Sequence, residues 1–352
     1  MKKIIHMIPK DGLGGVEQAA RSLNPDSHLD IETVFVCGET LSDKKHIKVV
    51  SEDIGLNSLA FYFRAFKYLV NTKPDLLICS LWRVSFVGVF YYLYTMLFYR
   101  EKVRLVVFIH SNKFAHYFDK FITKIAVSLA GEVWCDSEAS RNAILSISSN
   151  SGKFKVISFF VKNEGQKITS VHDRKNNFVF WGRIAKAKRL DRAIRLFNEV
   201  LKESGESLFY IYGPDSGELG NVQKLVNELN LTDKVIFMGS KKPNHYPEEL
   251  RNAKFFINTS THEGMAIAVV EAMQLGLIPV VTPVGEVGNY CIDGFNSIYY
   301  NESSKNKIIE TLNNSELCDS LSSNAIKYWL DHSDYTESFN QNCLRLVSGV
   351  GK

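Results

Sequence analysis

The sequence lacks a long hydrophobic run, has few cysteines and carries little net charge, and each shortage excludes a class of protein. The uncharged, aromatic-rich stretch Val84–Tyr99 is shorter than the roughly 20 residues that a membrane-spanning helix needs. The six cysteines form no CxxC pair and no His/Cys cluster with metal-ligand spacing, which indicates reduced thiols in a cytosolic protein. A formal charge of +4 argues against a nucleic-acid binder, which would carry a concentrated Lys/Arg stripe.

The remaining composition is typical of a two-domain α/β protein. The chain has 352 residues, 45% of them hydrophobic and 23% charged, as expected for a soluble protein with two globular domains. Strand-like runs alternate with helical ones on both sides of a polar stretch, 161–177, which we interpret as a linker. The alternation predicts α/β layers built on parallel sheets. The expected strands are Lys3–Ile8, Thr33–Cys37, Leu76–Ser80, Arg104–His110, Glu132–Cys135 and Lys155–Ser158, then Phe178–Trp181, Ser207–Tyr212, Lys234–Met238, Phe255–Asn258, Ile278–Thr282 and Ser297–Tyr300.

Polar features follow two strands of the first half, where ligands bind in doubly wound sheets. Gly12, Gly14 and Gly15 follow the first strand and precede a helical run. Their spacing is not the GxGxxG dinucleotide fingerprint, and a tight turn explains them as well as an anion site at a helix N-terminus does. His110 ends the fourth strand, where an imidazole either hydrogen-bonds a sugar or phosphate or serves the core.

The second half begins with a basic segment after its first strand. Arg183, Lys186, Lys188 and Arg189 all lie there, just before a helical run. Cations at a helix N-terminus oppose the macrodipole, so the pattern favours an anionic partner such as a diphosphate over a solvated basic turn.

Two carboxylates lie between Ser260 and Leu277. Glu263 occupies a strand-to-helix turn, and Glu271 lies inside an apolar helix, where an unpaired charge would cost several kcal/mol. The sequence therefore predicts a polar partner for Glu271. An acid/base pair for glycoside hydrolysis is disfavoured because both residues belong to one local segment, whereas the vicinal hydroxyls of a ribose suit a carboxylate.

These motifs together resemble the retaining glycosyltransferases of family 4, which have the GT-B fold. The resemblance rests on E-x7-E at Glu263 and Glu271, Trp-Gly-Arg183 followed by Lys188, and Tyr-Gly213-Pro, and it is strong from about Phe178 to Asn301. It implies two Rossmann-like domains facing across a cleft. The expected parts are 1–162 for the acceptor, 163–325 for the nucleotide-sugar, and a C-terminal helix in 326–352 that packs back on the first domain.

The resemblance also implies roles for site residues. Glu271 would bind ribose hydroxyls, Arg183 and Lys188 would hold the diphosphate leaving group, and Glu263 and His110 would contact the transferred sugar. The remaining positions assigned to the co-substrate are Gly14, Gly15, Gly213, Gly264, Met265 and Ala266.

The implied reaction moves a hexose from a UDP- or GDP-linked donor to a glycan or lipid-linked acceptor with retention. The family needs no metal or other cofactor, and the chain contains no Asp-x-Asp, the motif of metal-dependent glycosyltransferases. We expect a role in bacterial surface polysaccharide or lipopolysaccharide assembly, in the cytoplasm or peripherally on the cytoplasmic membrane face.

Several alternatives stay open. A non-catalytic nucleotide-sugar-binding protein would share the same binding residues, and a nicotinamide-dependent oxidoreductase would need the GxGxxG that is missing here. The stretch Val84–Tyr99 is expected to be a buried crossover helix, with monotopic membrane contact as the alternative.

Overall fold

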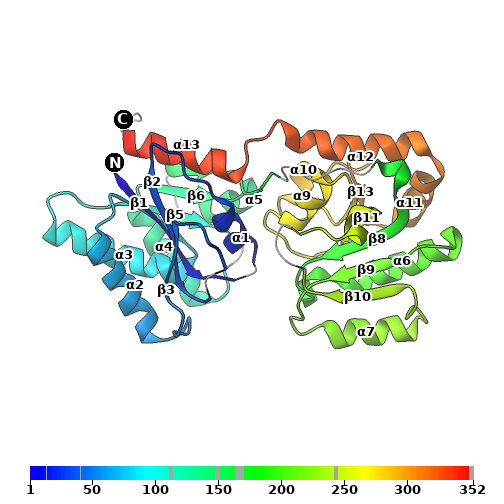
Figure 1. Cartoon of the computed structure of the whole chain (residues 1–352), viewed down its shortest axis with the longest axis horizontal. Coiled ribbons are helices and arrows are strands. Elements are labelled where there is room, and N and C mark those ends of the chain that lie inside the picture. Colours follow the sequence, from blue (N-terminus) through cyan, green and yellow to red (C-terminus); the bar gives the residue numbers. More distant parts are fainter. Residues whose placement is uncertain are drawn as a thin grey trace. The chain divides into compact units, whose positions relative to one another are not determined.

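The computed structural model describes residues 1–12, 14–39, 41–110, 114–146, 151–162, 170–241 and 245–348. The chain forms two compact units, the first from Met1–Val161 with Ser333–Lys352 and the second from Lys162–His332 (Figure 1). Each unit contains one parallel sheet, of seven strands in the order β3-β2-β1-β4-β5-β6-β7 and of six in the order β10-β9-β8-β11-β12-β13. The predicted fold class, two Rossmann-like α/β halves, is confirmed.

Strands of a parallel sheet are covered on both faces and therefore need apolar side chains on both faces. Most strands of the first sheet accordingly coincide with the apolar runs of the sequence. One strand, Ile47–Ser51, was not predicted. It lies at the sheet edge and pairs with β2, so it is only partly buried and lacks a continuous apolar run. The strands are β1 (Lys3–Lys10), β2 (Asp30–Cys37), β3 (Ile47–Ser51), β4 (Leu76–Ser80), β5 (Arg104–Ile109), β6 (Glu132–Cys135) and β7 (Phe154–Val156).

In the first unit, α3 packs against α2 and α4. The buried sides of these three helices form one hydrophobic core with the sheet. Phe61 and Ala65 of α2 and Val84 of α3 are fully buried in that core. The crossover helix expected around Val84–Tyr99 is confirmed as α3, which joins β4 to β5, but it is buried on one side only, since Phe90 and Phe98 are exposed. The helices between the strands are α1 (Gly15–Ser22), α2 (Leu59–Thr72), α3 (Trp82–Phe98), α4 (Tyr117–Leu129) and α5 (Glu138–Leu145).

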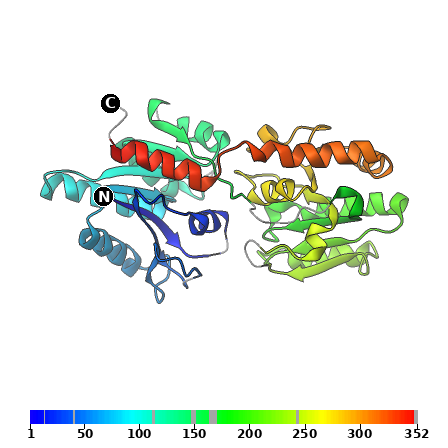
Figure 2. The ribbon, with the colours of Figure 1, turned by 45° about the horizontal axis from the view of Figure 1, so that its top comes forward.

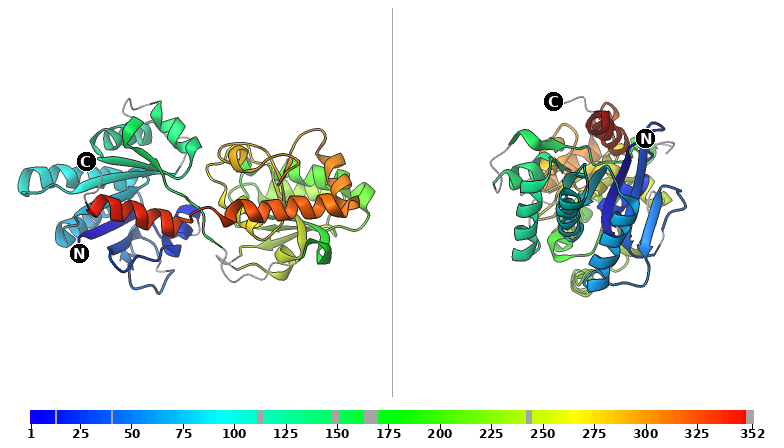
Figure 3. Two further views of the ribbon diagram at one scale, coloured as in Figure 1. Left: turned by 90° about the horizontal axis from the view of Figure 1, so that it is seen from above. Right: turned by 90° about the vertical axis from the view of Figure 1, so that its left-hand side faces the viewer.

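The tail that the sequence analysis treats as one helix is two helices that belong to different units. Helix α12 (Ser315–Leu330) ends in the second unit, where the Trp329 indole N–H points to the Met273 sulfur at 3.3 Å. The chain rejoins the first unit at Ser333 rather than at 326. Figure 3 follows both helices from above.

Helix α13 (Tyr335–Ser348) completes the first unit (Figure 2). Its first amide, Tyr335 N–H, donates to the Phe160 carbonyl at 2.8 Å. Near its end the Arg345 guanidinium makes a bidentate pair with the Glu132 carboxylate at 2.5 and 2.6 Å. The Phe339 ring between them is fully buried and packs on Trp134 of β6.

The second unit repeats the same layering around an aromatic core in which Phe178 stacks on Phe255.

The segment between the two units is shorter than the linker predicted at 161–177, since β8 already begins at Lys175. Residues 163–169 of that linker lie outside the described part. The strands are β8 (Lys175–Trp181), β9 (Phe209–Tyr212), β10 (Val235–Gly239), β11 (Ala253–Asn258), β12 (Ile278–Val281) and β13 (Ile298–Tyr299), and the helices are α6 (Leu190–Ser204), α7 (Leu219–Glu228), α8 (Glu248–Arg251), α9 (Ile267–Gln274), α10 (Val287–Tyr290), α11 (Ser304–Asn313) and α12.

Candidate functional site

Two glycines meet where β8 and β9 end, and they fix the loop that carries the basic segment. Gly182 and Gly213 have φ angles of +150° and +152°. A Cβ at Gly213 would lie 1.7 Å from the Gly182 carbonyl oxygen, so no larger residue fits there. Gly213, which the resemblance assigns to the co-substrate, therefore has a structural role that is visible here.

The predicted basic cluster divides into side chains with different partners. Arg183 is exposed, and no described residue accepts a hydrogen bond from its guanidinium. Lys188 ends a short 3-10 turn, and its ammonium lies 2.6 Å from the Glu263 carboxylate. Arg189 instead pairs with Asp191 at 2.7 Å. Lys188 thus pairs with the predicted site carboxylate Glu263, whereas Arg189 pairs with Asp191, which is not a predicted site residue.

Glu263 is held by side chains at the end of β11 as well as by Lys188. Its Oε1 accepts from the Asn258 amide at 3.1 Å and from the Ser260 hydroxyl at 2.6 Å. The loop backbones are also joined, since Thr261 N–H donates to the Ala187 carbonyl at 2.8 Å. Sequence reasoning missed Asn258 and Ser260, although polar residues directly after an apolar strand were a usable signal.

The turn between Glu263 and α9 is shaped by another close approach. A Cβ at Gly285 would lie 2.0 Å from the Glu263 carbonyl oxygen. Ala266 has a φ of +53°, and the Tyr290 hydroxyl donates to the Met265 carbonyl at 2.8 Å. The Gly264 carbonyl accepts from the Glu286 amide at 3.1 Å. The three predicted turn residues 264–266 are therefore held in one defined backbone conformation.

Glu271 has the polar partner that its apolar surroundings require. It lies in α9, only 8% exposed. The Trp181 indole N–H donates to its Oε2 at 2.6 Å, and the Tyr246 hydroxyl is a second donor. Burial raises the pKa of the Glu271 carboxyl, while the nearby Lys241 ammonium and the two donors oppose that rise.

Lys241 is the cation next to this cluster. Its ammonium lies 4.5 Å from the centre of the Tyr246 ring and 5.9 Å from that of Trp181, within cation–π range. Burial lowers the pKa of Lys241, and the Glu271 carboxylate partly offsets this. Sequence reasoning missed Tyr246 and Lys241, and it quoted Trp181 without a role.

The glycine-rich loop of the first unit starts α1. Gly14 is the residue before the helix and Gly15 is its first residue. A Cβ at Gly14 would lie 2.4 Å from the Glu17 carboxylate, so this acidic side chain already occupies the space beside the helix N-terminus. Asp11, before the glycines, is buried and ion-paired with Arg21. Leu13 lies outside the described residues.

His110 is buried in a polar cluster at the carboxyl end of the first sheet. Its imidazole is 1% exposed, and Nδ1 lies 3.9 Å from the Asp136 carboxylate. Its Nε2 and that of His6 lie 2.9 and 2.8 Å from the Ser80 hydroxyl. Burial lowers the pKa of His6 to about 3 and that of His110 well below its usual value, so both rings are neutral.

This burial favours the core role that the sequence left open for His110, and the sugar contact stays a prediction. The following residues, Ser111 and Asn112, lie outside the described part. No group of three or more His, Cys, Asp or Glu side chains among the described residues is arranged to hold a metal ion.

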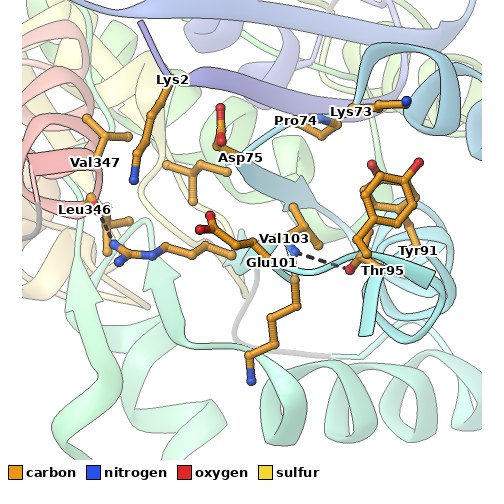
Figure 4. A pocket seen from close by; sticks show the side chains of 14 residues that line it. Lys2, Lys73, Pro74, Asp75, Tyr91, Thr95, Glu101, Val103, Leu346 and Val347 are labelled. Atoms are coloured by element: carbon orange, nitrogen blue, oxygen red, sulfur yellow. Dashed lines mark hydrogen bonds between the residues drawn. The ribbon is translucent and has the colours of Figure 1, made fainter. Parts of the chain in front are cut away.

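A separate pocket of about 260 Å³ lies at the opposite, amino edge of the first sheet (Figure 4). Asp75 and Glu101 point into it, and Lys2 and the end of α13 form part of its wall. None of the predicted site residues lines this pocket. Because ligands of doubly wound sheets bind at the carboxyl edge, we do not assign the predicted chemistry to it.

Part of the chain is similar in sequence to known proteins, and the whole chain is similar in fold to solved structures. Residues 161–328, nearly the whole second unit, match the family model described as glycosyl transferases group 1. The GDP-mannose:cellobiosyl-diphosphopolyprenol alpha-mannosyltransferase of Xanthomonas oryzae pv. oryzae is 32% identical over 30% of this chain and 28% of its own length. The alpha-monoglucosyldiacylglycerol synthase of Acholeplasma laidlawii is 24% identical over 64% of this chain and 65% of its own length.

The chain thus spans between 28% and 65% of the length of these two curated relatives. Among solved structures, Anabaena Alr3699/HepE in complex with UDP superposes with a TM-score of 0.76 at 17% identity, over 99% of this chain and 100% of that one. The chain therefore has the fold of the GT-B glycosyltransferases. Its second unit carries the segment that matches glycosyl transferases group 1.

Proposed function

We propose that this protein is a glycosyltransferase that moves a hexose from a nucleotide-diphospho-sugar to a saccharide acceptor, with retention and without a metal. The observation that carries the proposal is the pairing of Lys188 with Glu263, from the loops that follow β8 and β11, together with the exposure of Arg183 on the first of these loops. This is where a ligand of such a sheet binds.

The donor's parts are assigned to four side chains. Arg183 and one or both remaining N–H groups of the Lys188 ammonium bind the diphosphate. Glu263 accepts hydrogen bonds from the transferred sugar, and Glu271 accepts them from the ribose. Trp181 and Tyr246 orient the Glu271 carboxylate for that contact.

The chemical logic is electrostatic. Breaking the anomeric C–O bond leaves its electron pair on the diphosphate, where negative charge develops, while positive charge develops on the sugar ring. Preorganised cations at the diphosphate stabilise the first charge where it forms. The acceptor hydroxyl forms the new C–O bond, and its proton goes to a diphosphate oxygen on the same face, which retains the anomeric configuration.

The acceptor is proposed from the relatives. One relative acts on a cellobiosyl-diphosphopolyprenol and another is a diacylglycerol glucosyl synthase by name, so both names include a lipid. We assign this chain a glycan or lipid-linked acceptor in bacterial surface polysaccharide or lipopolysaccharide assembly, with peripheral contact to the cytoplasmic membrane face. The donor nucleotide is uridine or guanosine, since the names of the compared proteins include UDP and GDP.

The experiment is a donor panel with turnover as the readout. Thermal shifts with UDP- and GDP-sugars identify the donor, because a ligand that binds the folded state raises its stability. Release of nucleoside diphosphate, and the anomeric configuration of the product by NMR, then test transfer and retention. Chelator should leave the rate unchanged.

Two variants in the loop after β8 sharpen this test. Arg183→Met should lower the rate at least tenfold without changing the melting temperature, because the side chain is exposed and the change removes charge at the leaving group. Lys186→Met removes another exposed cation of the same segment and should leave the rate unchanged. Tight donor binding with no release for any donor and acceptor would instead identify a non-catalytic nucleotide-sugar-binding protein.

A further inference from the structure

The outer surface of α2, α3 and α4 carries aromatic side chains that the core does not use. Helices of a soluble domain normally present polar residues to water. Here Phe98 is 71% exposed and Tyr117 85% exposed. We call this set the aromatic surface, and it consists of Phe63, Phe90, Phe98, Tyr117, Phe118 and Phe121. In the described part of the second unit, Phe295 is the one large aromatic residue with a comparably exposed side chain.

Ring contacts around Phe86 link the three helices. Phe86 of α3 lies 5.5 Å from Tyr62 of α2, 4.7 Å from Phe90 and 6.5 Å from Phe118 of α4, between ring centres. Phe86 is thus the half-buried centre around which exposed rings from α3 and α4 gather. An exposed apolar surface of this kind usually marks an interaction site.

The three helices of the aromatic surface carry mostly positive charge. Helices α2 and α3 contain no acidic residue, and they carry Arg64, Lys67 and Arg83. Helix α4 adds the exposed Lys120 and Lys124. The acidic residue of α4, Asp119, is engaged locally, accepting from the Ala115 amide at 2.8 Å and the Thr123 hydroxyl at 3.1 Å.

We propose that the aromatic surface docks on a bilayer that contains anionic lipids. Aromatic rings with flanking lysines match the two layers of such a surface, because the rings enter the headgroup boundary and the ammonium groups meet lipid phosphates. A second copy of this chain is disfavoured, since a symmetric contact would bring Lys67, Lys120 and Lys124 against cations of the partner copy. Among the described helices, none combines the length and apolarity that crossing a bilayer requires.

This inference names the surface and the lipid chemistry for the membrane contact within the proposed function, and so rests on that contact. Its test needs no turnover. The full-length protein is sedimented with vesicles of phosphatidylcholine alone and with vesicles that also contain phosphatidylglycerol. Binding should require the anionic lipid and should weaken as salt is raised, since surface charges are screened beyond about 8 Å at physiological ionic strength.

Variants then locate the contact. The triple variant Phe90→Ser/Phe118→Ser/Phe121→Ser should lose vesicle binding, and its melting temperature should stay near that of wild type because these side chains are exposed. Lys120→Gln and Lys124→Gln should each lower partitioning about fivefold. Phe295→Ser, in the second unit, should bind vesicles like wild type.

Three results would overturn the proposal. One is wild-type protein that stays in the supernatant with both vesicle types. Another is a triple variant that binds as well as wild type, which would place the contact elsewhere. The third is a dimer in sedimentation velocity that the triple variant dissociates, which would assign the aromatic surface to a second copy. Loss of vesicle binding with nucleoside diphosphate release intact would separate this contact from the proposed transfer.

Discussion

Lys188 and Glu263 belong to loops that follow different strands, yet their side chains lie 2.6 Å apart, and the Ser260 hydroxyl also donates to the Glu263 carboxylate. The pair links the part of the site assigned to the diphosphate with the part assigned to the sugar. An ion pair of this kind lets binding of one part of the donor reposition a group that contacts the other.

The first prediction is that Lys188→Met and Glu263→Gln have non-additive effects. Either change leaves the other charge without its partner, whereas the double variant leaves neither. We expect the double variant to be more stable than the sum of the single effects predicts, by about 1–3 kcal/mol. Urea unfolding of the four proteins measures this coupling, and strict additivity would show that the pair contributes nothing.

Trp181→Phe should weaken nucleoside diphosphate binding. The change keeps an aromatic ring but removes the N–H that donates to Glu271. Losing a hydrogen bond to a charged group should lower affinity by roughly tenfold or more in isothermal titration. Trp329→Phe is the matched control, since that indole points to Met273 instead. Equal affinities for Trp181→Phe and wild type would refute the orienting role.

Gly213→Ala should strongly destabilise the second unit. The new methyl group would overlap the Gly182 carbonyl at a φ of +152°. We expect a loss of about 3 kcal/mol or more in the free energy of unfolding. Gly220→Ala, in α7, meets open space and should be neutral or stabilising by up to about 1 kcal/mol. Denaturant midpoints for the two variants test the difference.

Glu271→Gln should stabilise the protein at neutral pH while weakening donor binding. The pKa of Glu271 is raised in the folded state, chiefly by burial, so its ionisation destabilises the fold once the pH exceeds that of an unperturbed carboxyl. Below that range both states are protonated and the gain disappears. Loss of attraction to Lys241 works against the gain but is smaller than the burial effect. Melting temperatures measured from acid to neutral pH give the sign. A gain that grows as the pH falls would contradict it.

Arg345→Met should loosen α13 from the first unit. Burial raises the pKa of Glu132, but hydrogen bonds from Arg345 and Trp134 outweigh it and lower the pKa overall. The pair therefore stabilises the fold at neutral pH, and its contribution is lost as the pH falls through the folded pKa. We expect a loss of about 1 kcal/mol at neutral pH that shrinks in acid. Lys224→Met removes an exposed helix pair and serves as the control.

Most strands could be predicted because each is a continuous apolar run, which a parallel sheet requires on both of its faces. The edge strand β3 could not, because exposed Lys48 interrupts its short run and its burial depends on β2. The break between α12 and α13 also escaped prediction. Trp329 and Phe339 look alike as helical anchors, and only the tertiary fold sends them to different units.

In the candidate site, too, some features could be predicted from the sequence and others depend on the tertiary fold. That Glu271 needs a polar partner follows from its apolar neighbours, but the identity of the partner does not. Trp181 is 90 positions away in sequence, and β8 and α9 bring the two together. His110 was placed correctly at a strand end, while its burial beside His6 and Ser80 depends on three strands that sequence alone does not align.

The position of α13 has a consequence for synthesis. The ribosome produces residues 1–161 first, but the helix that covers His6 and Trp134 is translated only after the whole second unit. The first unit is therefore the first to begin folding and the last to be completed. Until α13 arrives, one side of its sheet remains open to chaperones, proteases and other nascent chains, whereas the second unit can fold as one uninterrupted stretch of chain.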